Sequence, residues 1–173
     1  MLRGINVGGH KKIRMQELKE LYESLGYREV QTYIQSGNVI FRCADLDTAE
    51  LKNRIESAIQ AAYGYSVAVL IRIPDEFRRL VENNPLSGEK DIDFTRLAVI
   101  FLSASPEKWP TENLEESKAE SEDLFISGRE IYLYYPEGYA KTKLSISLFE
   151  KQLKVYATAR NWRTVQKLRE LAG

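Results

Sequence analysis

Two short β-rich runs around a glycine turn set the fold class of the first half of this chain. The first run alternates as Val30-Gln31-Thr32-Tyr33-Ile34-Gln35, and after the turn Ser36-Gly37-Asn38 the second run reads Val39-Ile40-Phe41. Alternation with a period of two predicts a half-buried strand, and β-branched and aromatic residues favour extended backbone. Because only a short turn centred on glycine separates the runs, they predict a β-hairpin.

Amphipathic helices are predicted on both sides of this hairpin. Apolar residues recur at helical spacing between Met15 and Leu25, and Gly26 follows where a left-handed helix end is common. A second helix opens at Asp47 with Glu50 as its capping-box partner. Extended segments at Met1–Ile5 and Ser66–Ile73 then complete a β-α-β-β-α-β order, and a short helix from Pro74 is appended to it.

The second half is predicted to repeat this order. Placing Ser36-Gly37 on Ser127-Gly128 also brings Ile55 onto Ile146 and Ala62 onto Leu153, so a hairpin and a helix match together. The expected elements are a strand at Leu97–Leu102, a polar helix from Thr111, the hairpin around Ser127-Gly128-Arg129, a helix from Leu144 to Leu153, an extended stretch at Val155–Thr158 and a closing helix.

The predicted fold class is therefore α+β, with two ferredoxin-like (split βαβ) repeats, each βαββαβ-like with an appended helix. Composition places the first half at residues 1–85 and the second at 94–173, with a polar linker at 86–93; one compact unit is the alternative. At 173 residues the chain is long enough for a proper core, and 43% hydrophobic and 29% charged residues are ordinary for a globular protein.

Charge and cysteine content narrow the function classes. The chain has 25 basic residues (Lys and Arg) and 25 acidic residues (Asp and Glu), so its formal net charge is zero. A neutral chain does not favour nucleic acid as a partner, because contacts of basic side chains with phosphates supply most of the affinity for nucleic acid. The single cysteine, Cys43, fits a reducing compartment, and no segment resembles a membrane span or a signal peptide, so we expect a cytoplasmic protein. His10 is the only histidine, so neither a zinc site nor a nucleophile–base pair with Cys43 is indicated, and no carboxylate pair is singled out for acid–base work.

A glycine-rich loop is the first candidate for ligand binding. It precedes the first helix and offers glycines for close backbone approach and basic side chains for an anion. Its spacing is neither that of a P-loop nor GxGxxG, and a tight strand-to-helix connection is the alternative interpretation. The proposed binding residues are Arg3, Gly4, Asn6, Gly8, Gly9 and Lys12.

The second candidate is the segment that opens the last helix, Arg160-Asn161-Trp162-Arg163. Two arginines and an indole could bind a phosphate and stack on a planar group. Alternatively, Thr158 or Asn161 caps the helix, Trp162 packs on the sheet and the arginines pair with surface carboxylates.

Three runs resemble one known family. They are Leu2-Arg3-Gly4-Ile5-Asn6-Val7-Gly8-Gly9, Thr32-Tyr33-Ile34-Gln35-Ser36-Gly37-Asn38-Val39-Ile40-Phe41 and Thr158-Ala159-Arg160-Asn161-Trp162-Arg163-Thr164-Val165. Together they resemble the mainly bacterial group called domain of unknown function 1697. The resemblance implies a duplicated ferredoxin-like α+β fold and assigns no activity, cofactor or catalytic residue. Members usually carry several apolar residues before the first run, so we expect either that the first strand is short here or that Met1 is not the natural start.

Two functional hypotheses follow from these observations. The preferred one is a binding protein for a phosphate-bearing small molecule or a nucleotide, in which both candidate segments form one pocket. The alternative is an RNA- or protein-binding module that uses exposed sheet faces, with rings such as Tyr33 or Tyr134 uncovered. An uncharacterised hydrolase or transferase that uses the same loop is a weaker alternative. Cofactor and oligomeric state are not indicated by the sequence.

Overall fold

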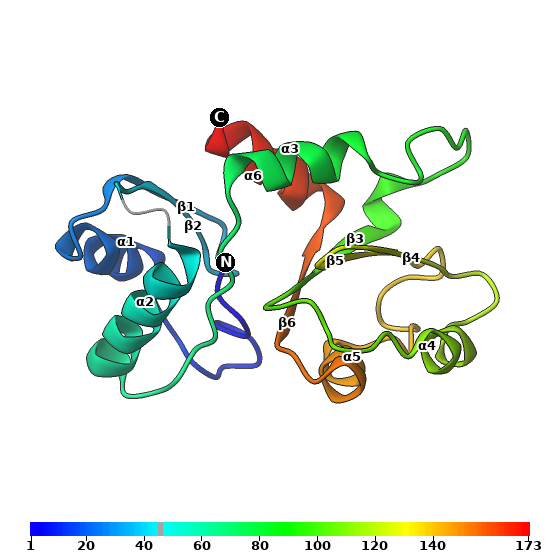
Figure 1. The fold of residues 1–173 in the computed structure, drawn as a ribbon, viewed down its shortest axis with the longest axis horizontal. Coiled ribbons are helices and arrows are strands. Elements are labelled where there is room, and N and C mark those ends of the chain that lie inside the picture. The colour runs from blue at the N-terminus through cyan, green and yellow to red at the C-terminus, as the bar shows by residue number, and fades with distance from the viewer. Residues whose placement is uncertain (45–46) are drawn as a thin grey trace. The chain divides into compact units, whose positions relative to one another are not determined.

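The computed structural model describes residues 1–44 and 47–173. It confirms a mixed α+β chain, with helices and two separate sheets (Figure 1). The chain forms two compact units, which we name unit 1 (Met1–Ile73) and unit 2 (Pro74–Leu171), and each is described by itself. Among the described residues, no helix combines the length and the apolar character needed to cross a membrane.

Unit 1 contains the predicted hairpin and its two flanking helices, but the turn comprises residues 34–37 and not Ser36–Asn38, because Ile34 leaves the extended conformation at a φ of 50° and Asn38 already pairs with Tyr33. Its elements are α1 (Met15–Ser24), β1 (Arg28–Tyr33), β2 (Asn38–Arg42) and α2 (Thr48–Tyr63). The hairpin is antiparallel, with Thr32 opposite Val39. The predicted cap is confirmed, because the Asp47 carboxylate accepts from the backbone N–H groups of Ala49 and Glu50, and Gly64 ends α2 in the left-handed conformation.

The two extended segments of unit 1, Met1–Ile5 and Ser66–Ile73, form only a short bridge. Leu2 bridges Val69 and also donates its N–H to the Gly37 carbonyl at 2.8 Å, so the first residues lie between the hairpin and residues 68–70. Gly4 and Asn6 then turn the backbone at positive φ, which ends the first strand. The strand predicted at Ser66–Ile73 is limited in the structure to the same short bridge at Val69, with backbone hydrogen bonds from Arg3 to Ala68 and from Leu70 to Met1 beside it.

Unit 2 is built on one antiparallel sheet in the order β4-β5-β3-β6. The elements are α3 (Pro74–Glu82), a 3₁₀ turn (Phe94–Arg96), β3 (Leu97–Leu102), α4 (Thr111–Ser117), β4 (Asp123–Ser127), β5 (Glu130–Tyr134), α5 (Ile146–Leu153), β6 (Ala157–Asn161) and α6 (Trp162–Ala172). The polar helix from Thr111 is confirmed, and the last strand starts two residues later than the stretch predicted from Val155.

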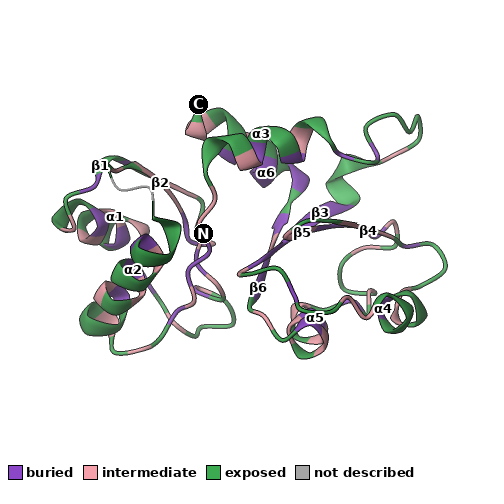
Figure 2. Cartoon of the chain, in the orientation of Figure 1, coloured by how far each residue is buried: buried purple, intermediate pink, exposed green. Residues whose placement is uncertain are grey.

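Helices cover both faces of this sheet. All six residues of β3 are buried, and on one face its side chains pack with Leu114 of α4 and Phe149 of α5. On the other face, Phe101 lies 5.8 Å from the Phe77 ring of α3, and α6 contributes Trp162. Figure 1 shows α3 and α6 on one side of the sheet and α4 and α5 on the other, and Figure 2 shows β3 buried between them.

The helix appended to the first half packs in unit 2. The compact units divide between Ile73 and Pro74, although composition placed the linker at 86–93. The reason is visible in α3, where Phe77 contacts β3 and the Leu80 carbonyl accepts a hydrogen bond from the Tyr132 hydroxyl at 2.7 Å. The polar composition of residues 86–93 marks a surface loop, and packing decides to which sheet the preceding helix belongs.

We predict that Gly37→Ala destabilises the protein strongly. Gly37 has a φ of +77°, and an added Cβ would lie 2.8 Å from both Leu2 and Ile5 side-chain atoms. Left-handed strain and this overlap together should lower the free energy of unfolding by about 3 kcal/mol. Gly64→Ala is the matched control, because its φ is +76° with no atom within 4 Å, and it should cost only about 1 kcal/mol. Urea denaturation of both variants checks this, and equal losses would contradict it.

Candidate functional site

The glycine-rich loop of unit 1 is a small hairpin. The Asn6 N–H donates to the Lys11 carbonyl at 3.2 Å, and the His10 N–H donates to the Val7 carbonyl at 3.0 Å. Gly8 and Gly9 form the two-residue turn, with φ of 58° and 80°. Positive φ at both central residues is the reason for glycine here. The geometry agrees with the tight-connection interpretation of these two glycines.

Asn6 holds this loop closed. Its side-chain amide donates to the carbonyls of Ile13 and Gln35, each at 2.9 Å, and its Oδ1 accepts from the Ile13 N–H at 2.9 Å. The side chain therefore joins the loop to the segment before α1 and to the hairpin β1–β2. With both N–H groups and one oxygen lone pair used, Asn6 has little capacity left for a ligand.

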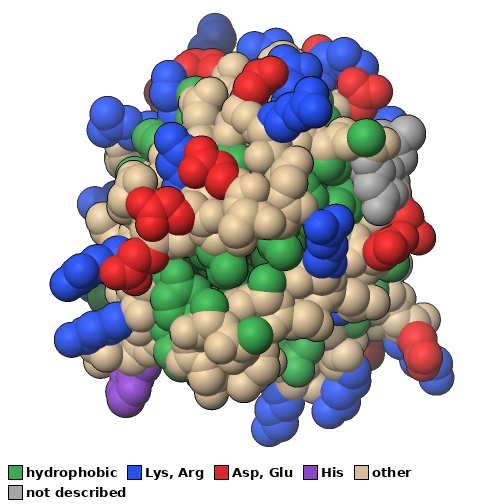
Figure 3. Space-filling model, turned by 90° about the vertical axis from the view of Figure 1, so that its left-hand side faces the viewer, with side chains coloured by type: hydrophobic (Ala, Val, Ile, Leu, Met, Phe, Trp, Pro, Cys, Tyr) green, Lys and Arg blue, Asp and Glu red, His purple; other side chains and the backbone are tan. Residues whose placement is uncertain are grey.

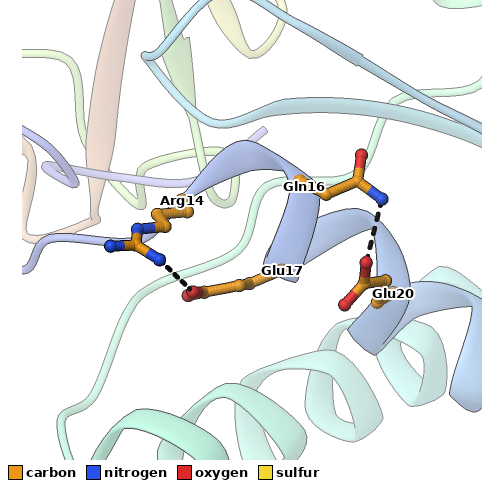
Figure 4. Close-up of polar contacts among 4 residues, drawn as sticks. All are labelled: Arg14, Gln16, Glu17 and Glu20. Atoms are coloured by element: carbon orange, nitrogen blue, oxygen red, sulfur yellow. Dashed lines mark hydrogen bonds and ion pairs between the residues drawn. The ribbon is translucent and has the colours of Figure 1, made fainter.

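Only some of the basic side chains around the start of α1 are available to bind an anionic ligand. Lys11 donates to the Ser66 carbonyl, and Arg14 lies 3.4 Å from Glu17. Figure 4 shows this ion pair beside the hydrogen bond from Gln16 to Glu20 on the same helix. Lys12 is exposed, and its ammonium group has no partner among the described residues. Figure 3 shows basic and acidic side chains interspersed on the face that carries α1 and α2, so no single basic patch forms there.

We predict that Asn6→Ala destabilises unit 1 even though Asn6 is only half-buried. The substitution leaves the Ile13 N–H and the Gln35 carbonyl without their partner, and it should lower the free energy of unfolding by about 2–3 kcal/mol. Lys12→Ala in the same loop should stay within about 0.5 kcal/mol of the wild type because its side chain faces solvent. Chemical denaturation provides the comparison, and a loss under 0.5 kcal/mol for Asn6→Ala would refute this role.

The second predicted segment lies in unit 2, and most of it is structural. Asn161 caps α6, because its Oδ1 accepts from the Thr164 N–H at 2.9 Å. Trp162 is buried, with its ring 6.1 Å from Phe94 and 6.4 Å from Tyr132. These contacts agree with the capping and packing interpretation of both residues.

The two arginines of this segment, Arg160 and Arg163, differ in how far they are exposed to solvent. Arg160 is only 6% exposed, and it donates to the Thr158 hydroxyl and the Ala159 carbonyl, each at 2.8 Å. Burial lowers the pKa of Arg160 to about 10. Arg163 is exposed and has no side-chain partner among residues 1–44 and 47–173. The glycine-rich loop belongs to unit 1 and this segment to unit 2, so neither unit by itself contains both.

A pocket that the sequence did not indicate lies within unit 2, between α3 and the turn of the β4–β5 hairpin. Its volume is about 310 Å³. The lining is mostly polar and comes from two segments far apart in the chain: Glu76, Arg79, Leu80, Asn83, Ser127, Gly128, Arg129, Glu130 and Tyr132. Gly128, with a φ of 60°, forms the tight turn that closes one end.

The polar groups of the pocket are not all satisfied. Arg129 forms an ion pair with Glu76, so these two charges compensate one another. By contrast, the side chains of Arg79, Asn83 and Ser127 make no hydrogen bond or ion pair with any described residue. Arg79, Asn83 and Ser127, whose side chains carry a guanidinium, an amide and a hydroxyl, therefore line one hollow with side-chain hydrogen-bonding capacity still unused.

Tyr132 belongs to the pocket lining and also ties α3 to the sheet. Burial, and to a smaller extent the negative charge of Glu130, raises the pKa of Tyr132 to about 12. Its hydroxyl stays protonated at neutral pH and donates to the Leu80 carbonyl. In the part of the chain that the structure describes, no group of three or more His, Cys, Asp and Glu side chains could hold a metal ion.

Sequence reasoning missed this pocket because its two lining segments look ordinary when taken separately. In the sequence, Arg79 is typical of a residue on the polar face of a short helix, and Ser127-Gly128-Arg129 is typical of a hairpin turn. Their proximity depends on the docking of α3 on β5, which no local pattern encodes. The one sequence feature that could have indicated this site is the pair of adjacent arginines, Arg78 and Arg79, on the short helix before the linker.

The raised pKa of Tyr132 predicts a specific alkaline response. The unfolded chain ionises this phenol near pH 10 and the folded chain near pH 12, so its stabilising contribution is complete below pH 10 and is lost as the pH rises towards 12. Tyr132→Phe should be less stable than the wild type at pH 8, and the difference should shrink between pH 10 and 12. Thermal melts across this range measure it, and a constant difference would be inconsistent with the raised pKa.

Comparisons with known proteins complete the description. A family described as "Protein of unknown function (DUF1697)" matches residues 1–132. A solved structure described as that of a conserved bacterial protein from Streptococcus pneumoniae is similar at 26% sequence identity and a TM-score of 0.71, covering 100% of this chain and 96% of that one. Among curated proteins, no relative of the chain is found.

Proposed function

Because the chain belongs to the DUF1697 family, whose description names no activity, we propose a function from the pocket of unit 2: the protein binds a small molecule that carries one phosphate group. A phosphorylated metabolite or a mononucleotide fits this description. The phosphate would occupy the hollow between α3 and the β4–β5 turn. This keeps the ligand class that the sequence indicated and assigns it to different residues.

The observation that carries the proposal is the uncompensated guanidinium of Arg79 at the pocket. Arginine matches the geometry of a phosphate with paired N–H donors, and charge-assisted hydrogen bonds are about twice as strong as neutral ones. Asn83 and Ser127 line the same hollow and supply further donors. These three side chains are the ones that would contact the phosphate oxygens.

The charges of the lining favour a ligand with a single phosphate. Two arginines and two glutamates surround the pocket, and Arg129 already pairs with Glu76. The negative charges of a triphosphate would be repelled by Glu76 and Glu130, and Arg79 would be the one lining cation not already paired with a glutamate. The volume of about 310 Å³ lies at the lower end of the range for small-molecule sites, which also favours a small ligand.

We also infer that the two halves are duplicated ferredoxin-like repeats. The order β4-β5-β3-β6 in unit 2 is the strand order of a split βαβ unit, and the contacts of Leu2 with Val69 and Gly37 give the same neighbours in unit 1. A helix follows the last strand in each half, α3 in one and α6 in the other. A cytoplasmic, bacterial setting suits the single cysteine, Cys43.

The binding proposal is tested by calorimetric titration with inorganic phosphate, a sugar phosphate and a nucleoside monophosphate. Arg79→Ala should raise the dissociation constant at least about tenfold, because it removes charge-assisted hydrogen bonds worth roughly 1.5–3 kcal/mol. Arg78→Ala is the matched control, since Arg78 is the adjacent arginine, pairs with Asp75 and does not line the pocket. It should bind like the wild type.

Lys12→Ala and Arg163→Ala distinguish this site from the two segments that the sequence singled out. Both should leave the affinity unchanged if the pocket is the binding site. Weaker binding in these variants, with normal binding in Arg79→Ala, would transfer the site to the loop and the start of α6. Absence of binding in the wild-type protein with all three probes would refute the proposal.

A further inference from the structure

We propose that β4 is a pairing edge through which two copies of this chain join their unit 2 sheets. The two β4 strands would lie antiparallel across a two-fold axis and form one continuous sheet. This inference does not depend on the ligand pocket, because it rests on the backbone of β4 rather than on Arg79 or its neighbours.

The position of β4 leaves one side of the strand open. It is the end strand of the order β4-β5-β3-β6, and β5 is its neighbour in the sheet. Outside the ladder with β5, no backbone hydrogen bond joins residues 123–127 to any other described residue. Phe125 is 37% exposed at the middle of this strand. An open edge with a central exposed aromatic ring can accept another strand.

The turn geometry identifies the backbone groups that face outward. Ser127 pairs with Glu130 across the two-residue turn, so this pair exchanges hydrogen bonds with one another. Because such pairs alternate along an antiparallel ladder, Phe125 and Asp123 also bond to β5. The N–H and C=O groups of Leu124 and Ile126 then point away from β5 and are the four groups offered to a partner.

The strand lacks most of the usual protection against edge pairing, since its one charge, Asp123, lies at the end of the strand. Natural edge strands are commonly blunted by central charges, by proline, by lysine or by a β-bulge. Residues Asp123-Leu124-Phe125-Ile126-Ser127 contain neither proline nor lysine, and their register with β5 runs without a break. The central Leu-Phe-Ile run is uncharged, so a second strand meets no charge there.

The sequence of β4 is complementary to itself, which identifies the occupant as a second copy. With the two-fold axis at Phe125, Leu124 faces the partner subunit's Ile126, and the two residues exchange both hydrogen bonds. Asp123 then faces the partner subunit's Ser127, where the carboxylate can accept from the hydroxyl. The two Phe125 rings lie side by side and cover each other. An isologous contact of this kind closes with two copies and leaves no further edge from β4.

The first test is the mass of the wild-type protein in solution over a wide concentration range. Sedimentation velocity should show a shift from the monomer of 19.9 kDa to twice that mass as the concentration rises. Phe125→Lys places two like charges opposite each other at the axis and should weaken the dimer at least about tenfold. Val7→Lys is the control, because Val7 is also exposed (66%) and lies in unit 1. It should dimerise like the wild type.

A cross-linking variant tests the register itself. Directly opposite residues in a non-hydrogen-bonded pair are close enough for a disulfide. In a Cys43→Ser background, Phe125→Cys should therefore form a covalent dimer under mild oxidation, and Val7→Cys should not. A wild-type protein that stays monomeric at every concentration, or equal cross-linking in both variants, would overturn the proposal. A dimer that survives Phe125→Lys would place the contact elsewhere and overturn it as well.

Discussion

Burial of β3 on both sides is the constraint on which unit 2 depends. All six residues from Leu97 to Leu102 are buried, and the strand lies between β5 and β6. Apart from Ala98, each of these side chains contributes roughly 1.5–3 kcal/mol when it leaves water, so both faces of the sheet have to be covered by helices. α4 and α5 cover one face, and α3 and α6 cover the other.

This layering covers both faces of the sheet of unit 2. An RNA-recognition sheet needs an open face with stacked aromatic rings, but Tyr132 lies buried between β5 and α3, and Tyr134 is half-buried. The polar pocket lies beside the sheet, between α3 and the turn of the β4–β5 hairpin. Along the outer edge of the sheet, backbone groups of β4 have no partner among the described residues.

The elements that the sequence predicted well are those that local chemistry specifies. The hairpin β1–β2 and the capped helix α2 depend on turn residues, a cap and periodicity, all within a few residues. The assignment of α3 to unit 2 and the length of the first strand depend on contacts between distant segments. Phe77 against Phe101 is such a contact, and no local pattern reveals it.

The candidate site shows the same division between local and distant information. Glycines, asparagines and tryptophans attract attention in a sequence because they occur at binding loops, yet they serve turns, caps and packing equally well. Here Asn6 ties a loop, Asn161 caps a helix and Trp162 fills the core. Arg79 gives no such local signal, because what distinguishes it is a side chain without a partner among the described residues.

An NMR titration of the isotope-labelled wild-type protein with a nucleoside monophosphate tests the pocket of unit 2 most directly. The amide signals of Ser127–Glu130 and of Arg79–Asn83 should shift together with one dissociation constant, because both segments line the same pocket. Shifts confined to Asn6–Lys12, or no shifts at all, would contradict it.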